Sequence, residues 1–479
     1  MPYLSVAAIN AAVDHITATY PALAVPVALP EASVEGRPVK ALKIGDGTGT
    51  GRTAVLFLGG THARELINPE TLISFALRLC DAYTNNTGLA FGPRTYDPGS
   101  IQSLVKTLDI VLVPMVNPDG RNYCLVGGDP MWRKNRANHP GNACRGVDLN
   151  RNYDFLWSSG IGTSSNSCSD VYKGPSAFSE PETRNVRWLI DQYTNLSCLV
   201  DVHSYSELVL YPWGDDENQT TDPNQNFLNP AFDGQRGVVG SGYKEYIPAA
   251  DEQAHEAMGQ RVRDGIAAVR GRTYTVQPSI ALYPTTGTAH DYAYAHHFVH
   301  TGRRRILGYT LETARTFQPG DVEKNNVITE VSAGLMEFLL ETLCPADVIQ
   351  ALVDALFPLD DMRRFRDNVM VSTKAGKRYE QLFRKHSDEV ARLFSGNKAA
   401  LKAGTELLTI AGRMVDDDGN GAVRKIGPRD VTDITTALTQ LQKLGSPELK
   451  ADLSATLKDL EDLQGNTMAE IFVRLSKPR

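Results

Sequence analysis

The stretch from residue 53 to residue 79 constrains the fold of this chain more than any other. Thr53–Leu58 is a short apolar run with β-branched and aromatic residues, which predicts a buried strand. A helix start follows, with Asn68 as the N-cap and Pro69 at the first helical position. A buried strand that leads through a turn into a helix is typical of α/β sheets, which bind ligands at the carboxyl ends of their strands.

A candidate metal site lies in the turn between that strand and that helix. His62 and Glu65 are three residues apart, so their side chains can reach one cation. Zinc accepts nitrogen and carboxylate oxygen at similar distances, roughly 2.0–2.2 Å. Because this pair arises by chance in many chains, a third ligand is needed at the end of another buried strand. Leu196–Val202 predicts such a strand, and His203 follows it directly.

Two further features lie in polar or strand-end positions. The long stretch 121–175 has few periodic patterns, and loops of this length inside a domain are usually functional. It holds two arginine-containing clusters, 131–136 and 147–153, and guanidinium groups bind carboxylates through paired hydrogen bonds. Ile306–Leu311 predicts another buried strand, with Glu312 at its carboxyl end. Glu312 is either a general base or an ordinary solvated carboxylate.

The bulk composition excludes several classes of partner. With 479 residues the chain has room for two or three domains, and its net charge of −7 provides no basic surface for nucleic acid. No apolar run approaches the roughly 18 residues that span a membrane. Met1–Val13 lacks the basic region of a signal peptide, so no secretion signal is expected unless it has been removed. Cys144 and Cys168 flank a polar stretch, and a secreted form follows if they are bridged.

The pattern changes after about Cys344, where strand signals stop and helical spacing begins. Residues 343–479 therefore predict an all-α C-terminal domain, with a helix that starts at Ser446 and Pro447. Asp416–Asp418 resembles the first half of a calcium-binding loop, which makes Ca²⁺ a candidate ligand. An acidic turn is the alternative, because Gly427 occupies the position where the loop needs a glutamate.

Taken together, these motifs resemble the zinc carboxypeptidases of the carboxypeptidase A/B family. The resemblance covers roughly residues 1–342 and implies an α/β catalytic domain with a mixed, largely parallel twisted sheet flanked by helices. The motifs that carry it, in the order of the family, are His62-Ala63-Arg64-Glu65, Trp132-Arg133-Lys134, Asp148-Leu149-Asn150-Arg151-Asn152, His203-Ser204-Tyr205-Ser206, Tyr283 and Glu312.

The resemblance implies a metal centre and two catalytic side chains. His62, Glu65 and His203 would hold one Zn²⁺. Glu312 would act as the general base toward the attacking water, and Arg133 would stabilise the oxyanion.

The resemblance also implies a set of substrate-binding residues. These are Asn150, Arg151 and Tyr283 for the terminal carboxylate, Arg64 and Tyr205 for the next subsites, and Leu210, Gly214, Thr285, Thr288, His290 and Thr310 for the terminal side chain. Asp148 would orient His62, and Cys144 and Cys168 stand where the family has a disulfide. His290 occupies the position that carries an acid for basic substrates or an aliphatic residue for apolar ones.

The function that follows is a zinc-dependent exopeptidase, which removes the C-terminal residue from peptides or proteins. Because His290 is neither acidic nor aliphatic, a neutral terminal residue (aromatic, aliphatic or polar) is expected. Two other classes stay open. One is a zinc amidase or cell-wall peptide hydrolase on the same fold, and the other is a binding protein without catalysis. The natural substrate, the compartment and the role of the C-terminal domain are left open.

Overall fold

The computed structural model describes most of the chain, in two compact units. The described residues are 3–47, 52–141, 143–343, 370, 372–396, 400, 402–404, 406–407, 410–411, 425–460 and 465–476. One unit comprises Met1–Gly47 and Thr53–Thr342, and the other comprises Thr48–Arg52 and Leu343–Arg479. Among the described helices, none is both long enough and apolar enough to cross a membrane.

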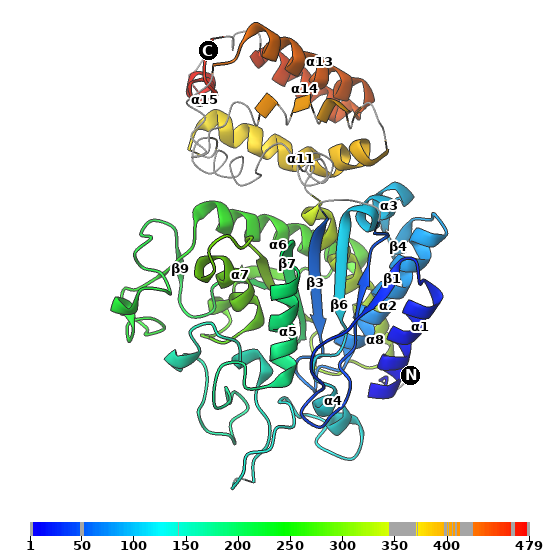
Figure 1. Cartoon of the computed structure of the whole chain (residues 1–479), viewed down its shortest axis with the longest axis vertical. Helices are drawn as coiled ribbons and strands as arrows, with labels where there is room; N and C mark the ends of the chain where they lie inside the picture. The colour runs from blue at the N-terminus through cyan, green and yellow to red at the C-terminus, as the bar shows by residue number, and fades with distance from the viewer. Residues whose placement is uncertain are drawn as a thin grey trace. The chain divides into compact units, whose positions relative to one another are not determined.

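An eight-stranded mixed sheet forms the centre of the first unit (Figure 1). The four central neighbours β6, β3, β7 and β12 run parallel, and antiparallel pairs occur on both sides of them. This arrangement confirms the predicted α/β fold with a mixed, largely parallel sheet. The strands in spatial order are β1 (Ala24–Val27), β2 (Ala41–Ile44), β6 (Leu108–Val113), β3 (Thr53–Gly59), β7 (Leu196–Ser204), β12 (Leu307–Thr313), β8 (Leu208–Tyr211) and β11 (Thr275–Pro278).

Helices cover both faces of the sheet because its central strands are apolar on both sides. In β3, Leu56 and Leu58 belong to the apolar cluster that includes α5 and α7, whereas Phe57 packs its ring edge-on against Phe75 of α2. Each such fully buried side chain contributes about 1.5–3 kcal/mol. The helices that cover the sheet are α5 (Pro181–Gln192) and α7 (Ala289–Val299) on one face, and α2 (Ile67–Thr84), α6 (Ala249–Arg270) and α8 (Asp321–Thr342) on the other.

Smaller elements complete this unit at the edges of the sheet and in the connections. Two two-stranded sheets lie outside the main sheet. These elements are α1 (Val6–Thr19), α3 (Pro98–Thr107), α4 (Pro118–Leu125), the antiparallel pair β4 (Leu89–Phe91) and β5 (Arg94–Tyr96), and the parallel pair β9 (Asn218–Gln219) and β10 (Glu245–Tyr246).

The predicted start of α2 is wrong by two residues. The helix begins at Ile67, and its N-cap Leu66 makes no capping hydrogen bond through its side chain. Asn68 lies instead in the first turn, fully buried, where its Oδ1 accepts a hydrogen bond from Thr313 Oγ1 at 3.1 Å. A contact with a distant strand therefore overrides the local capping preference of asparagine.

The polar ends of three central strands meet at one edge of the sheet. Gly59 of β3 pairs with Val202 of β7, and His203 of β7 pairs with Glu312 of β12. His203 and Glu312 lie inside their strands rather than just after them, because the parallel pairing continues through both residues. Gly59 is required at this edge, since a Cβ atom there would lie 2.9 Å from the Pro114 carbonyl oxygen.

The second unit is helical, which confirms the predicted all-α fold of the C-terminal part within the residues described. The predicted helix start after Ser446 is also confirmed, because the Ser446 hydroxyl accepts a hydrogen bond from the Leu449 amide at 3.2 Å. The candidate calcium loop at Asp416–Asp418 lies outside the described residues. The helices are α11 (Lys374–Gly396), α13 (Pro428–Leu444), α14 (Pro447–Leu460) and α15 (Met468–Leu475).

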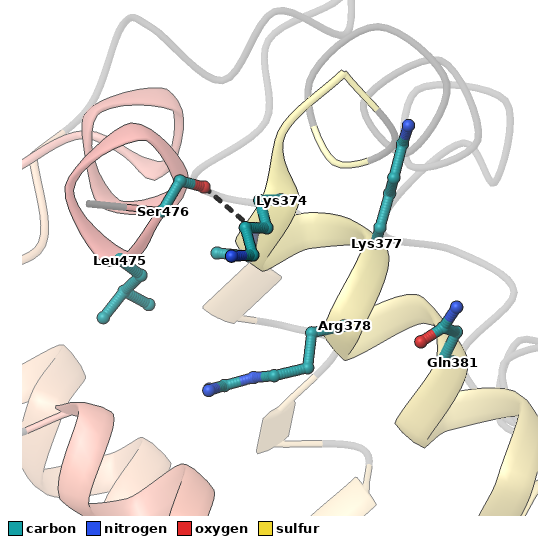
Figure 2. Close-up of a pocket in the computed structure, with 7 residues that line it drawn as sticks. Lys374, Lys377, Arg378, Gln381, Leu475 and Ser476 are labelled. Atoms are coloured by element: carbon teal, nitrogen blue, oxygen red, sulfur yellow. Dashed lines mark hydrogen bonds between the residues drawn. The ribbon is translucent and has the colours of Figure 1, made fainter. Parts of the chain in front are cut away.

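An open pocket of about 500 Å³ lies where α11 and α15 meet (Figure 2). The Ala375 amide donates a hydrogen bond of 2.8 Å to Ser476 Oγ, which joins the start of α11 to the end of α15. Lys374 and Lys377 give the pocket a basic wall, and the third cation, Arg378, is paired with Asp459.

Candidate functional site

Three side chains converge at the carboxyl edge of β3 and β7. His62 Nδ1 lies 2.8 Å from Glu65 Oε1, and His203 Nδ1 lies 3.0 Å from His62 Nδ1 and 3.1 Å from Glu65 Oε2. All three residues are buried, and one potential ligand atom from each lies within 4.8 Å of the other two. Within the described part of the chain, this is the only such group of histidine, cysteine, aspartate or glutamate residues.

A second carboxylate faces the outer nitrogen of each imidazole. His62 Nε2 lies 3.0 Å from Asp148 Oδ1, and His203 Nε2 lies 2.8 Å from Asp201 Oδ2. Asp201 is itself held by the Thr61 hydroxyl, which donates a hydrogen bond of 2.9 Å. A carboxylate at Nε2 favours the proton on that nitrogen, which leaves the Nδ1 lone pair free for a metal ion.

The charges around this group suit a divalent cation. Burial opposes ionisation of Glu65, yet the two imidazoles hold the pKa of Glu65 well below its usual range. Burial likewise opposes protonation of His203, but Asp201 and Glu65 raise the pKa of His203 well above its ordinary value. The site therefore attracts positive charge, which a metal ion supplies by displacing a proton. Two imidazole nitrogens and one carboxylate form a donor set that zinc accepts.

Arg133 and Glu312 line one cavity together with His62. Arg133 donates two hydrogen bonds to Asp148 Oδ2, from Nε at 3.0 Å and from Nη2 at 2.9 Å. Burial, followed by the nearby charge of Glu65, raises the pKa of Glu312 to about 8 in the metal-free protein. Glu312 Oε2 is buried and has no hydrogen-bond partner among the described residues, so it is available to a ligand.

The same cavity brings together eight of the eleven predicted substrate-binding residues, which are Asn150, Arg151, Leu210, Tyr283, Thr285, Thr288, His290 and Thr310. Arg151 is held by backbone carbonyls, since its Nε donates to Gly162 at 3.0 Å and its Nη1 to Asn150 at 2.6 Å. Its guanidinium carbon lies 6.0 Å from the centre of the Tyr283 ring, which is about half exposed. The cavity therefore has a cationic wall beside the candidate metal ligands.

Arg64 and Tyr205 do not line that cavity but share a third residue, Phe317. The Arg64 guanidinium carbon lies 4.3 Å from the centre of the Phe317 ring, and the Tyr205 ring meets Phe317 edge-on at 4.8 Å. Residue-level reasoning had not singled out Phe317, since an isolated aromatic residue in a loop carries no pattern. Asp201 was also missed, although an aspartate inside an apolar strand, two residues before a candidate ligand, was a usable signal.

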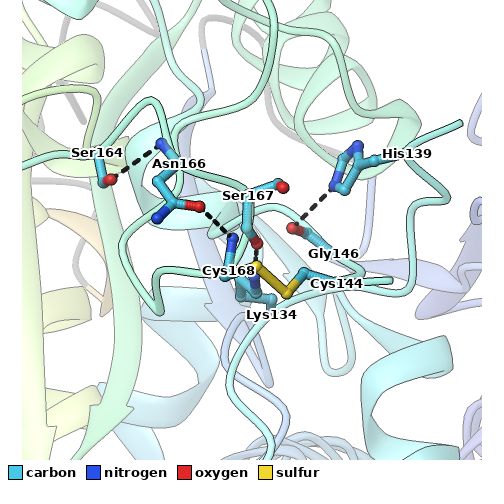
Figure 3. Close-up of a disulfide and its surroundings, with 8 residues drawn as sticks. All are labelled: Lys134, His139, Cys144, Gly146, Ser164, Asn166, Ser167 and Cys168. Atoms are coloured by element: carbon cyan, nitrogen blue, oxygen red, sulfur yellow. Dashed lines mark hydrogen bonds between the residues drawn. A yellow bond between two sulfur atoms is a disulfide. The ribbon is translucent and has the colours of Figure 1, made fainter. Parts of the chain in front are cut away.

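A disulfide joins Cys144 to Cys168, the pair left open by the residue pattern and implied by the resemblance (Figure 3). Lys134 is buried next to it and donates a hydrogen bond of 2.6 Å to the carbonyl of Ser167. Because Lys134 follows Arg133 directly in the chain, the cross-linked loop supports the backbone that carries Arg133.

Comparison with known proteins agrees with this geometry. The family model described as zinc carboxypeptidase matches residues 9–333. The chain belongs to the zinc carboxypeptidase family. Mouse carboxypeptidase A4 (Mus musculus) is 32% identical over 293 residues, which cover 61% of this chain and 59% of the relative. Carboxypeptidase B of Helicoverpa zea is 37% identical over 220 residues, which cover 45% of this chain and 47% of the relative. The chain thus spans about half the length of these family members.

Two solved structures share the fold of this chain. A crystal structure of thrombin activatable fibrinolysis inhibitor superposes with a TM-score of 0.57 at 24% identity, over 70% of this chain and 73% of that one. Carboxypeptidase A from Helicoverpa armigera superposes with a TM-score of 0.53 at 24% identity, over 74% of each chain. The family match ends at residue 333, near the end of the first unit.

Proposed function

We propose that this chain is a zinc-dependent carboxypeptidase, which hydrolyses the C-terminal peptide bond of peptides or proteins. The observation that carries the proposal is the convergence of His62, Glu65 and His203 beside a cavity lined by Glu312 and Arg133. Residues 1–342 form the catalytic domain in this proposal, and residues 343–479 form a helical domain whose role is open.

In this proposal His62, Glu65 and His203 hold the zinc ion, which, when bound, activates a water molecule and polarises the scissile carbonyl. Glu312 accepts a proton from the attacking water and passes it to the leaving amine, a role that suits a buried carboxyl group with a raised pKa. Arg133, oriented by Asp148, faces the negative charge that develops on the carbonyl oxygen.

The cationic wall supports exopeptidase specificity. Arg151 is buried, and its guanidinium group offers paired hydrogen bonds that suit a terminal carboxylate. Asn150 and Tyr283 line the cavity beside it and complete the proposed clamp. A substrate without a free carboxyl end would leave this buried cation unpaired, which strongly disfavours binding.

The pocket for the terminal side chain favours an uncharged residue in this proposal. His290 is buried, and burial lowers the pKa of its imidazole to about 3, so it carries no charge at neutral pH. Leu210, Thr285 and Thr288 line the same cavity and are uncharged as well. A terminal lysine or arginine would therefore find no counter-charge among these four residues.

The test combines metal analysis of the full-length protein with peptide hydrolysis. We expect about one zinc ion per chain and an activity on free-carboxyl peptides that a chelator removes and zinc restores. Glu312→Gln should lower kcat by about 10²–10⁴-fold, since proton transfer loses its acceptor, while zinc content is unchanged. An equally active Glu312→Gln variant would contradict the proposal.

Amidated peptides of the same sequence separate the alternatives. We expect their kcat/KM to fall by orders of magnitude, because Arg151 then has no carboxylate to bind. Equal hydrolysis of both peptide forms would indicate an amidase or another hydrolase. Binding of peptides without any hydrolysis would indicate a binding protein that keeps the fold.

A further inference from the structure

Two buried polar groups without partners line the proposed side-chain pocket. His290 is 2% exposed and Thr285 is 4% exposed, and both line the cavity that contains Glu312. Neither His290 Nε2 nor Thr285 Oγ1 has a hydrogen-bond partner among the described residues. Leaving a buried polar atom without a partner destabilises the protein, so a ligand that completes both hydrogen bonds is favoured.

The neighbouring hydroxyl groups are already engaged. Thr310 Oγ1 lies 3.0 Å from His290 Nδ1. Thr288 caps α7 and donates a hydrogen bond of 2.8 Å to Asp291 Oδ2. Gly214 leaves Thr285 uncovered, since a Cβ atom at Gly214 would lie 2.3 Å from Thr285 Oγ1. His290 and Thr285 are therefore the groups that a substrate side chain would meet.

The surroundings of His290 determine which kind of partner it takes. Asp291 Oδ1 lies 3.4 Å from His290 Nε2, outside good hydrogen-bond geometry. Burial raises the pKa of Asp291 to about 7, and above that pH its carboxylate, at this distance, favours the proton on Nε2, so that the Thr310 hydroxyl donates to Nδ1. The imidazole thus presents an N–H donor. Lysine and arginine side chains carry only hydrogen-bond donors, so they cannot accept from this N–H group, and an acidic side chain would have to bury its negative charge in the pocket.

We infer that this pocket selects an uncharged C-terminal side chain that ends in a hydrogen-bond acceptor, an amide or a hydroxyl group, over an apolar side chain of the same size. His290 and Thr285 are the residues that determine this specificity. The inference rests on the proposed carboxypeptidase function and narrows its substrate class from neutral residues in general to polar neutral residues.

The experiment uses N-acylated dipeptides that differ only in the terminal residue. The matched pairs are Asn and Leu, Gln and Met, and Tyr and Phe, each measured by kcat/KM at pH 8 with the full-length zinc-loaded protein, and dipeptides that end in Lys and Arg are measured alongside. We expect the polar member of each pair to be hydrolysed roughly 10-fold faster or more, because the apolar member leaves buried groups unpaired.

Two variants assign the effect to the pocket. His290→Leu should bring the Asn/Leu ratio close to one while hydrolysis of the Leu substrate continues, and Thr285→Val should reduce the ratio without changing side-chain size. His300→Leu is the matched control, since His300 is exposed at the end of the same helix α7 and should leave the ratio unchanged.

The outcomes separate this inference from the proposed function. Hydrolysis with equal rates within each pair, or a preference for terminal Lys or Arg, would overturn the inference and leave the carboxypeptidase function intact. A ratio that survives in His290→Leu would also overturn it. No hydrolysis of any free-carboxyl peptide would overturn the function. Calorimetry with N-acetyl-asparagine and N-acetyl-leucine then provides a second readout of the pocket, and equal affinities would overturn the inference.

Discussion

Asp148 holds two proposed functional residues at once, and replacing it tests how the centre is organised. Its side chain is fully buried; Oδ1 lies 3.0 Å from His62 Nε2, and Oδ2 accepts two hydrogen bonds from Arg133. Burial opposes its ionisation, but Arg133 and His62 hold the pKa of Asp148 well below its usual range. Asp148→Asn removes the charge and one acceptor with almost no change in volume.

An asparagine cannot satisfy both neighbours. If its oxygen faces Arg133, its amide group donates to His62 Nε2, and the imidazole proton must move to Nδ1, the nitrogen that faces Glu65. If its oxygen faces His62, the amide NH₂ group faces the guanidinium group, and two hydrogen-bond donors meet without an acceptor. The first arrangement blocks the proposed metal ligand, and the second leaves a buried cation without its carboxylate.

The expected magnitudes follow from these two losses. Removing the partner of a metal-binding histidine lowers metal affinity by about 10–100-fold. Breaking a buried ion pair costs about 3–5 kcal/mol of unfolding free energy. The lower end applies here, because Arg133 lines the cavity and reaches solvent through it. A misplaced Arg133 should also lower kcat by about 10²–10³-fold, which is the loss typical of removing one oxyanion donor.

Zinc competition with a chromophoric chelator measures the affinity, and urea unfolding of the metal-free protein measures stability. Asp264→Asn is the control, since Asp264 is exposed and pairs only with its neighbour Arg263 in the described contacts. A zinc affinity within twofold of wild type, together with lowered stability, would refute the role of Asp148 in orienting His62.

Two further predictions concern stability. Burial raises the pKa of Glu182 from 4.5 to about 7, so the folded state binds more protons than the unfolded state between these values, and this carboxyl group lowers stability as pH rises from 4.5 to 7. In urea unfolding, the unfolding free energy of Glu182→Gln relative to that of wild type should therefore rise by about 2–3 kcal/mol between pH 4 and pH 8. A difference between the two proteins that does not change with pH would contradict the raised pKa. Replacing Cys144 and Cys168 with serine should lower the unfolding free energy by about 3.5 kcal/mol, the value for a loop of about 25 residues. An unchanged urea midpoint would show that the bridge does not constrain the unfolded chain.

The central strands β3, β7 and β12 could be predicted because they follow from local patterns. Each is a nearly continuous apolar run, which is typical of a strand buried on both faces. Element ends were less predictable. Asn68 resembles an N-cap, but its side-chain oxygen accepts a hydrogen bond from Thr313 instead.

Part of the candidate site was also accessible from spacing. His62 and Glu65 share one turn, so their proximity is a local property. The roles of Arg133, Asn150 and Arg151 were not derivable in this way and entered only through the family resemblance. Their loop has no period, and its path depends on contacts such as that between Arg151 and the carbonyl of Gly162.

The order of residues along the chain therefore specified three central strands, the helical character of the C-terminal part, the pair of ligands on one turn and the family. The tertiary structure decided that His203 joins that pair, because β7 lies parallel and adjacent to β3, and that Glu312 lies beside it, because β12 pairs with β7. It also decided that Asp201 supports His203 and that His290 is buried without a partner for Nε2. Strand order and burial depend on contacts between residues far apart in the chain, which no local pattern encodes.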